Sequence, residues 1–224
     1  MVPVDAGLEV HAVNMDDRTA ATKINFFMTS LFSIIFTKIF AKTDVREHGS
    51  GNAGFTNTIR TAGKKVGILV FICDALKAVA AILIAMAVAK WLPFDAYVQY
   101  GKFAAALGAV LGHNFPLYYG FRGGKGIVVS IAIIYSLNWI TGCFTLGAFL
   151  VVFAITGIVS LSSLTGAATV MITTLVMYLN GWAGVEVVQL VLMLVMGVLA
   201  FYMHRANIKR LLNGTESSFK KKKK

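Results

Sequence analysis

Charged residues are scarce in this sequence: Asp, Glu, Lys and Arg make up 14% of the 224 residues, and only ten of them are acidic. A soluble domain carries about 25% charged residues. Between Gly126 and His204 there is no Lys, Arg or Asp, and Glu186 is the only acidic residue. Nothing elsewhere in the chain could cover so long an apolar segment in water. The composition therefore predicts an all-α integral membrane protein.

Cysteine is almost absent as well. Cys73 and Cys143 lie among apolar residues without metal-ligand spacing, so both are interpreted as packing residues. The net charge of +11 includes the terminal run Lys220 to Lys224. Such runs most often contact anionic lipid headgroups, and no specific role is assigned to this one. The other basic residues are scattered over several loops and form no stripe on one face. Nucleic acid is therefore not an expected partner.

The chain is divided by its apolar runs. Residues 1–23 are polar and lack the apolar core of a signal peptide, so they are interpreted as a leader of unknown order, followed by a transmembrane domain at 24–204 and a basic tail at 205–224. A spanning helix needs about 20 residues. The fourth and fifth apolar runs are shorter, and they can form two spans, one longer span or a re-entrant pair. The apolar runs cover 24–41, 66–89, 101–119, 127–141, 143–159, 161–180 and 184–203.

The basic residues predict an orientation. They concentrate in the segments after the first run, after the third run and after the last run, with Lys90 and Lys102 as exceptions. About seven transmembrane helices would place all these segments on one side, which the positive-inside rule makes the cytoplasmic side. The amino terminus would then lie outside. The polar and glycine-rich loops collect on this same face, so function is sought there.

The first such loop is Gly49–Asn57, GSGNAGFTN, whose first six residues match the dinucleotide pattern G-x-G-x-x-G. The pattern lacks the strand and βαβ unit of a Rossmann fold, so that interpretation fails. Glycines still let backbone N–H groups approach an anion closely. A flexible polar turn is the alternative, but Ser50, Asn52, Asn57 and Arg60 add donors and favour an anion site.

A second loop combines Gly112–Pro116 (GHNFP) with Phe121–Gly126 (FRGGKG). Its glycines around Lys125 resemble a phosphate cradle. It is not a Walker A loop, because Gly126 stands where Ser or Thr should follow the lysine. His113 can be a structural hydrogen-bonding residue or a catalytic one, and the sequence does not separate these two roles.

Two further elements lie near the predicted cytoplasmic face. Val159–Leu164 (VSLSSL) carries hydroxyls that suit either a helix cap or a packing site of small residues. In His204–Glu216 (HRANIKRLLNGTE), His204 and Asn207 are three residues apart and share one helical face. The basic residues of this segment can also serve as a positive-inside anchor.

Asp74 and Lys77 are three residues apart inside the second apolar run. Ionisable groups at such a depth are costly and tend to pair. We therefore expect an ion pair that supports the shape of the site rather than one that takes part directly in the chemistry.

A different pattern, H-x-x-x-x-D at His11–Asp16, matches soluble-type glycerolipid acyltransferases. It lies in the polar leader, far from every basic loop, and is rejected.

Taken in order, the four elements resemble one family. G-S-G-N-x-G-x-T-N-x-x-R, then G-H-x-F-P with F-x-G-G-K-G, then S-L-x-S, then H-R-x-N-I-x-R-L-L-x-G-T-E are similar to bacterial acyl-phosphate:glycerol-3-phosphate acyltransferases of the PlsY type. The resemblance covers Asn25 to Glu216. It implies seven membrane helices in the bacterial inner membrane, with the active site facing the cytoplasm.

The resemblance also implies an activity. The enzyme would transfer a fatty acyl group from acyl phosphate to the sn-1 hydroxyl of glycerol 3-phosphate, giving lysophosphatidic acid and phosphate, with no metal, nucleotide or coenzyme A as cofactor. Acyl phosphate, glycerol 3-phosphate and membrane lipid are the implied partners. Carried onto this sequence, the residues that hold the substrates are Ser50, the backbone at Gly51, Asn52, Arg60, Lys125, His204 and Asn207.

Roles within this set are expectations. Ser50, Asn52 and Lys125 would grip the acyl phosphate, whereas Arg60, His204 and Asn207 would hold glycerol 3-phosphate. Asn57 is added to the substrate-binding residues. The proton acceptor is either a substrate phosphate or His113.

A membrane transporter of an organic phosphate is the alternative function. Such proteins place their sites near the bilayer midplane and often contain repeats, and no repeat is visible in this sequence.

Overall fold

The computed structural model describes residues 31–91 and 95–220, and all regular elements in this part of the chain are helical. The leader at 1–23, the His11–Asp16 pattern and the first residues of the first apolar run lie outside the described residues. In chain order the elements are α2 (Phe32–Ala41), η1 (Val45–Glu47), α3 (Phe55–Ala89), α4 (Asp95–Asn114), η2 (Leu117–Tyr119), α5 (Ile127–Leu137), α6 (Trp139–Thr156), α7 (Val159–Leu179), η3 (Trp182–Gly184), α8 (Val187–Met203) and α9 (Arg205–Leu212).

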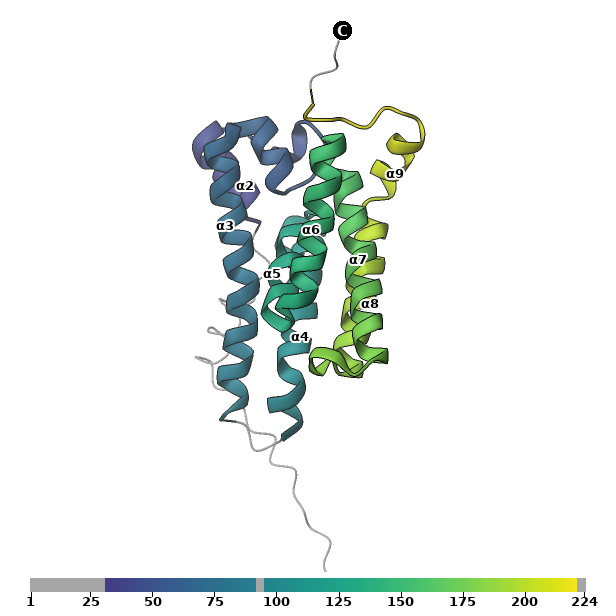
Figure 1. Ribbon diagram of the computed structural model, residues 1–224. Helices are drawn as coiled ribbons and strands as arrows, with labels where there is room; N and C mark the ends of the chain where they lie inside the picture. Colours follow the sequence, from purple (N-terminus) through teal and green to yellow (C-terminus); the bar gives the residue numbers. More distant parts are fainter. Residues whose placement is uncertain (1–30, 92–94, 221–224) are drawn as a thin grey trace, which may run out of the picture.

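The long helices run side by side in one bundle, and α2, the first turns of α3 and α9 gather at its upper end in Figure 1. A core of buried apolar side chains connects α3, α4, α5, α7 and α8. Ala78 of α3 and Ala106 of α4 are fully buried there, beside Ile133 of α5 and Met193 of α8. Since lipid is as apolar as these side chains, close packing through small residues holds such helices together.

The expected membrane character is confirmed. Within the described residues, α3, α6 and α7 are long and apolar enough to cross a membrane, and α8 with α9 forms a fourth span if the pair, bent by 58°, is counted as one. Helices α2 and α5 are apolar but shorter. Seven spans therefore remain a prediction.

The uncertain boundary between the fourth and fifth runs is resolved into two helices that meet at Asn138. Its backbone is extended, with φ −156° and ψ 101°, so α5 ends there. Its side chain accepts the backbone N–H of Thr141 at 3.0 Å and caps α6. Helix α5 has only 11 residues, so it is about 16 Å long and too short to cross a bilayer alone.

Gly63 breaks the long helix α3 near the site. Its φ of 84° lies in the region that favours glycine, and the helix is kinked there. The helical turns before Gly63 follow the glycine-rich loop and carry Asn57 and Arg60, whereas the predicted span at 66–89 lies after Gly63. The kink therefore separates the membrane-crossing part of α3 from the part that carries polar residues of the site.

Candidate functional site

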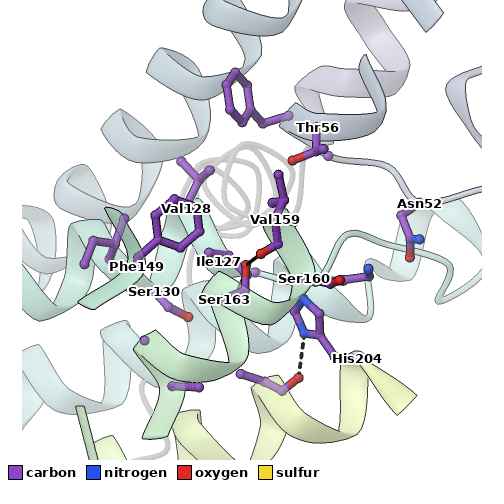
Figure 2. A pocket seen from close by; sticks show the side chains of 18 of the residues that line it. Asn52, Thr56, Ile127, Val128, Ser130, Phe149, Val159, Ser160, Ser163 and His204 are labelled. Atoms are coloured by element: carbon purple, nitrogen blue, oxygen red, sulfur yellow. Dashed lines mark hydrogen bonds between the residues drawn. The ribbon is translucent and has the colours of Figure 1, made fainter. Parts of the chain in front are cut away.

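A cavity of about 420 Å³ lies at the end of the bundle where the predicted loops meet. One part is polar and the rest is lined by apolar side chains of α5, α6, α7 and α8. Figure 2 shows Asn52, Ser160 and His204 on one side of it and Ile127, Val128 and Phe149 on the other. The cavity is lined by the predicted residues Ser50, Asn52, Asn57, Arg60, His113, Lys125, His204 and Asn207, and also by Asp74, Ser160 and Glu216.

The first glycine-rich loop is shaped by the side chain of Asn57, which is 2% exposed. Its amide nitrogen donates to the carbonyl oxygens of Val45, His48 and Asn52 at 2.8, 2.9 and 3.1 Å, and its amide oxygen accepts the Ser50 N–H at 2.9 Å. Asn57 was predicted to bind substrate. These hydrogen bonds hold Ser50 and Asn52 in place, and substrate binding by Asn57, which also lines the cavity, stays a prediction.

Two glycines of this loop have different roles. Gly49 has φ 58°, and a Cβ there would lie 2.3 Å from the Asn57 amide oxygen, so only glycine fits. Gly51 has φ 70° and donates its N–H to the His48 carbonyl oxygen at 3.0 Å. It does not line the cavity, unlike the other predicted site residues. An anion could use the Gly51 N–H only after this hydrogen bond was exchanged.

The two glycine-rich loops are joined by Arg46, which the sequence analysis did not single out. Its guanidinium donates to both carboxylate oxygens of Asp44, at 3.0 and 2.8 Å, and to the Tyr119 carbonyl oxygen at 3.2 Å. The hydrogen bond from Arg46 lowers the pKa of Asp44 to about 2. The pair therefore stays charged at neutral pH and ties the loop before α3 to the loop before α5.

Lys125 stands at the centre of the polar part. Its Nζ donates to the Asn207 amide oxygen at 2.5 Å, so loop residues and α9 meet here. Burial lowers the pKa of Lys125 to about 8, because the charged form loses hydration. The preceding Gly124 lies against His113, and a Cβ at Gly124 would be 2.2 Å from the His113 Nε2. The second loop thus needs glycine at this position for close contact with His113, and its use as a phosphate cradle stays a prediction.

The expected ion pair in the second apolar run is confirmed and includes a third residue. Lys77 Nζ donates to Asp74 Oδ1 at 2.6 Å and lies 3.0 Å from His113 Nδ1. All three side chains are buried. A charged lysine can only donate, so Nδ1 of His113 is the acceptor and a neutral His113 carries its proton on Nε2. In this arrangement neither ring nitrogen of His113 is free to accept a proton from a substrate, because Nδ1 already accepts from Lys77 and Nε2 already carries a proton.

His204 lies where α8 and α9 meet and is 2% exposed. Its Nδ1 is 2.8 Å from the Ala200 carbonyl oxygen and must donate, since a carbonyl only accepts. A neutral His204 ring therefore presents Nε2 as an acceptor. Figure 2 shows this bond and the ring beside Ser160 at the polar side of the cavity.

Glu216 organises the polar part and was not predicted as a site residue. Its side chain, 7% exposed, accepts from Asn207 at 2.7 Å, from Ser160 at 2.9 Å and from Arg210 at 2.6 Å. Burial alone would raise the pKa of Glu216, but these hydrogen bonds outweigh it and leave the pKa lowered. The carboxylate fixes the Asn207 amide so that its oxygen faces Lys125.

The hydroxyls of the VSLSSL segment are divided between two uses. Ser162 and Ser163 donate to the carbonyl oxygens four residues earlier, at 2.8 and 2.9 Å. None of the segment's side chains caps the start of α7. Ser160 instead binds Glu216 and lines the cavity. The helix-cap interpretation is therefore wrong, and the segment links α7 to the carboxyl-terminal part of the site.

The described residues contain no group of three or more His, Cys, Asp or Glu side chains arranged to hold a metal ion. The polar part of the cavity gathers cationic, amide and hydroxyl groups from four separate segments. Such donors suit phosphate or carboxylate groups. The fold and the site together define an integral membrane protein with a cationic polar site that continues into an apolar cavity.

The chain belongs to the glycerol-3-phosphate acyltransferase family. The profile of the family "Glycerol-3-phosphate acyltransferase" matches residues 20–214. A glycerol-3-phosphate acyltransferase of Halalkalibacterium halodurans is 40% identical over 198 residues, which cover 86% of this chain and 90% of that protein. One of Clostridioides difficile is 40% identical over 191 residues, covering 85% of this chain and 89% of that protein.

A solved structure has the same fold. The crystal structure of PlsY, an integral membrane glycerol 3-phosphate acyltransferase, in its glycerol 3-phosphate form superimposes with a TM-score of 0.72 at 33% identity, covering 90% of this chain and 96% of that chain. The lysophosphatidic acid form gives a TM-score of 0.70 at the same identity. The family resemblance predicted from the four motifs is confirmed.

Proposed function

We propose that this chain transfers a fatty acyl group from acyl phosphate to the sn-1 hydroxyl of glycerol 3-phosphate, giving lysophosphatidic acid and inorganic phosphate for phospholipid biosynthesis. The observation that carries the proposal is the cavity, which joins a cationic polar part to a long apolar part. Both proposed substrates have a phosphate, and one of them has an acyl chain. Family membership and the glycerol 3-phosphate form of the solved relative support the same acceptor.

The two headgroups would lie side by side. Lys125, with Ser50 and Asn52, would bind the acyl phosphate, and Arg60, His204 and Asn207 would bind glycerol 3-phosphate. The hydrogen bond between Lys125 and Asn207 supports this, because it joins the two proposed groups of residues directly. Charge-assisted hydrogen bonds of this kind contribute about 1.5–3 kcal/mol each.

The reaction needs no covalent enzyme intermediate, because an acyl phosphate is an activated mixed anhydride. The primary hydroxyl oxygen of glycerol 3-phosphate attacks the acyl carbonyl carbon and forms the ester bond. The bond between that carbon and the phosphate oxygen breaks, and phosphate leaves with the electron pair. Positioning of the two reactants can supply about 7–11 kcal/mol of the barrier. Lys125 would stabilise the charge on the departing phosphate.

The proton of the attacking hydroxyl would go to a phosphate oxygen. His113 was the other candidate, but its Nδ1 faces the Lys77 ammonium and its Nε2 carries the proton in the neutral ring. His204 offers an acceptor Nε2, which suits a glycerol hydroxyl as a hydrogen-bond donor. We therefore assign His204 to orienting glycerol 3-phosphate and the phosphate group to accepting the proton.

The protein would lie in the bacterial inner membrane with the site facing the cytoplasm, where soluble glycerol 3-phosphate is available. The basic loops before α3 and α5 and the tail after α8 support this orientation through the positive-inside rule. Sealed vesicles of defined orientation would test it. Inverted vesicles should use externally added glycerol 3-phosphate at once, and right-side-out vesicles should use it only after permeabilisation.

Purified protein in detergent should release phosphate from acyl phosphate only when glycerol 3-phosphate is present, and lysophosphatidic acid should form in equal amount. Lys125→Ala and Arg60→Ala should lose most of this activity. The exposed Lys64, which lies in α3 just beyond the kink at Gly63, provides a control, and Lys64→Ala should keep the activity. Activity with acyl-coenzyme A but not with acyl phosphate would contradict acyl phosphate as the acyl donor. Flux of glycerol 3-phosphate into vesicles without acylation would instead favour the transporter.

A further inference from the structure

The short segment Ser217–Lys220, here called the carboxyl-terminal strap, lies across the polar end of the cavity. In Figure 1 the chain leaves α9 and passes over the ends of α7 and α6 before the carboxyl terminus. Ser217 and Phe219 line the cavity itself. The match to the family profile ends at residue 214, before the strap begins.

The strap is fastened to the end of α6. Phe219 N–H donates to the Gly157 carbonyl oxygen at 2.8 Å, and Ser218 Oγ donates to the Thr156 carbonyl oxygen at 3.0 Å. A Cβ at Gly157, which has φ 67°, would lie 2.7 Å from Ser218 Oγ. These contacts use the carbonyl groups that the last turn of a helix leaves unpaired, so the strap continues the capping of α6.

On its other side the strap holds Arg60. The Arg60 Nη2 donates to Ser217 Oγ at 2.9 Å, and its guanidinium carbon lies 5.3 Å from the centre of the Phe219 ring. The Phe219 ring is in turn placed by Phe153 of α6, with ring centres 6.2 Å apart in an edge-on arrangement. Arg60 is an exposed side chain on the first turns of α3. Without the strap these contacts with Arg60 would be lost.

We infer that Ser217 and Phe219 are positioning residues for the acceptor substrate: they hold the Arg60 guanidinium at the cavity mouth in the orientation that binds the glycerol 3-phosphate phosphate group. This inference rests on the proposed function for the identity of the phosphate. The guanidinium lies over the Phe219 ring and donates one N–H to the Ser217 hydroxyl. Further N–H donors remain for a phosphate, because a guanidinium carries five.

Binding of glycerol 3-phosphate should therefore depend on the strap, whereas binding of acyl phosphate should not. Phe219→Leu should raise the KM for glycerol 3-phosphate by about two- to fivefold, the range of a cation–π contact at an exposed site. A chain that stops after Glu216 should raise it by about twentyfold or more, since it also loses the hydrogen bond to a charged group. Phe219→Tyr keeps an aromatic face and should restore the parent KM.

The experiment measures KM for each substrate, kcat, the Kd of glycerol 3-phosphate by calorimetry and thermal unfolding in detergent. Leu212→Ala removes an 83% exposed apolar side chain from the end of α9 and should change none of these quantities. A selective rise in KM and Kd for glycerol 3-phosphate supports the inference. Unchanged values, or a parallel loss in both substrates, kcat and melting temperature, would overturn it and make the strap a general structural clamp.

Failure of the proposed function would look different. The parent protein would then give no acyl transfer from acyl phosphate, although calorimetry could still detect glycerol 3-phosphate. Strap-dependent Kd values in that case would support the role of Ser217 and Phe219 and reject only the reaction. Strap-independent Kd values would reject the role itself, whatever the reaction.

Discussion

The Nζ of Lys77 lies 3.0 Å from the Nδ1 of His113 and 2.6 Å from the carboxylate of Asp74. These three groups are buried between α3 and α4, next to the polar part of the cavity. The ring faces the lysine with one nitrogen and Gly124 of the second loop with the other. The cluster thus connects the interior of the bundle to the loop that carries Lys125.

His113 should not act as the general base. His113→Gln keeps an amide oxygen that can accept from Lys77, so the cluster can persist without the imidazole. We expect kcat to fall by less than tenfold, whereas a general base contributes about 10²–10⁴ in rate. Steady-state kinetics at saturating substrates would measure this. A loss of a hundredfold or more with unchanged glycerol 3-phosphate affinity would restore His113 to the catalytic role.

Lys77→Met should destabilise the protein strongly. The substitution leaves the Asp74 carboxylate buried without its cation, and such changes cost about 3–5 kcal/mol. The double variant Asp74→Leu/Lys77→Met removes both charges and should recover most of this stability. Thermal unfolding of the purified variants in one detergent compares them. A double variant as unstable as the single one would mean that the ion pair itself, rather than an unpaired charge, determines stability.

The sequence predicted an apolar helix best where polar residues or glycines separate it from its neighbours. The runs at 161–180 and 184–203 correspond to α7 (Val159–Leu179) and α8 (Val187–Met203). The boundary at Asn138 could not be settled, because apolar residues continue on both sides and only the conformation of Asn138 ends α5. Hydropathy also gave no sign of the break at Gly63, since a glycine within a helical pattern is usually tolerated.

The site was predictable where a loop has a distinctive composition. Glycines with Asn or Lys indicated both loops, and the predicted residues of these loops, except Gly51, line one cavity. The roles of Asn57 and Glu216 were not predictable, although both lie in the quoted motifs. Each acts by hydrogen bonds to other segments, which a linear pattern does not contain. The role of Arg46 was not predictable for the same reason, because its partner Tyr119 is 73 residues away in the sequence.

Activity should fall above pH 8 because Lys125 loses its proton there. Burial lowers the pKa of Lys125 to about 8, and the charged form of the side chain is the one that binds phosphate. The fraction of enzyme able to bind acyl phosphate therefore decreases as the pH rises through this value. Phosphate groups have a second pKa of about 6, so their charge does not change between pH 8.5 and 9.5. The kcat/KM for acyl phosphate should drop nearly tenfold between pH 8.5 and 9.5, about the limit set by one deprotonation.

Lys125→Arg provides the control for this pH effect. Arginine stays charged throughout the range, so whatever activity the variant retains should not fall between pH 8.5 and 9.5. The measured quantity is the slope of kcat/KM against pH. This slope reports the loss of charge on residue 125, whereas a poorer fit of arginine in the site would lower the activity equally at every pH. If the parent protein shows no decline, or if the arginine variant declines equally, deprotonation of Lys125 does not limit the reaction.

The apolar part of the cavity should select acyl-chain length, and Gly166 of α7 offers a way to shorten it. Gly166 lines the cavity, and a Cβ there would come no closer than 3.5 Å to Thr145, so the backbone has room for a side chain. Gly166→Val would fill space that the end of a long chain could occupy. Extra or missing methylenes in such pockets change kcat/KM by about 10–200-fold.

We therefore expect Gly166→Val to lower kcat/KM for the longest acyl phosphates by about tenfold while leaving shorter donors unaffected. Gly147 of α6 is the matched control: it is helical, a Cβ there meets nothing within 4 Å, and it does not line the cavity. Gly147→Val should leave chain-length preference unchanged. A uniform loss across all donors would show that valine disturbs helix packing, and an unchanged preference would place the acyl chain outside this cavity.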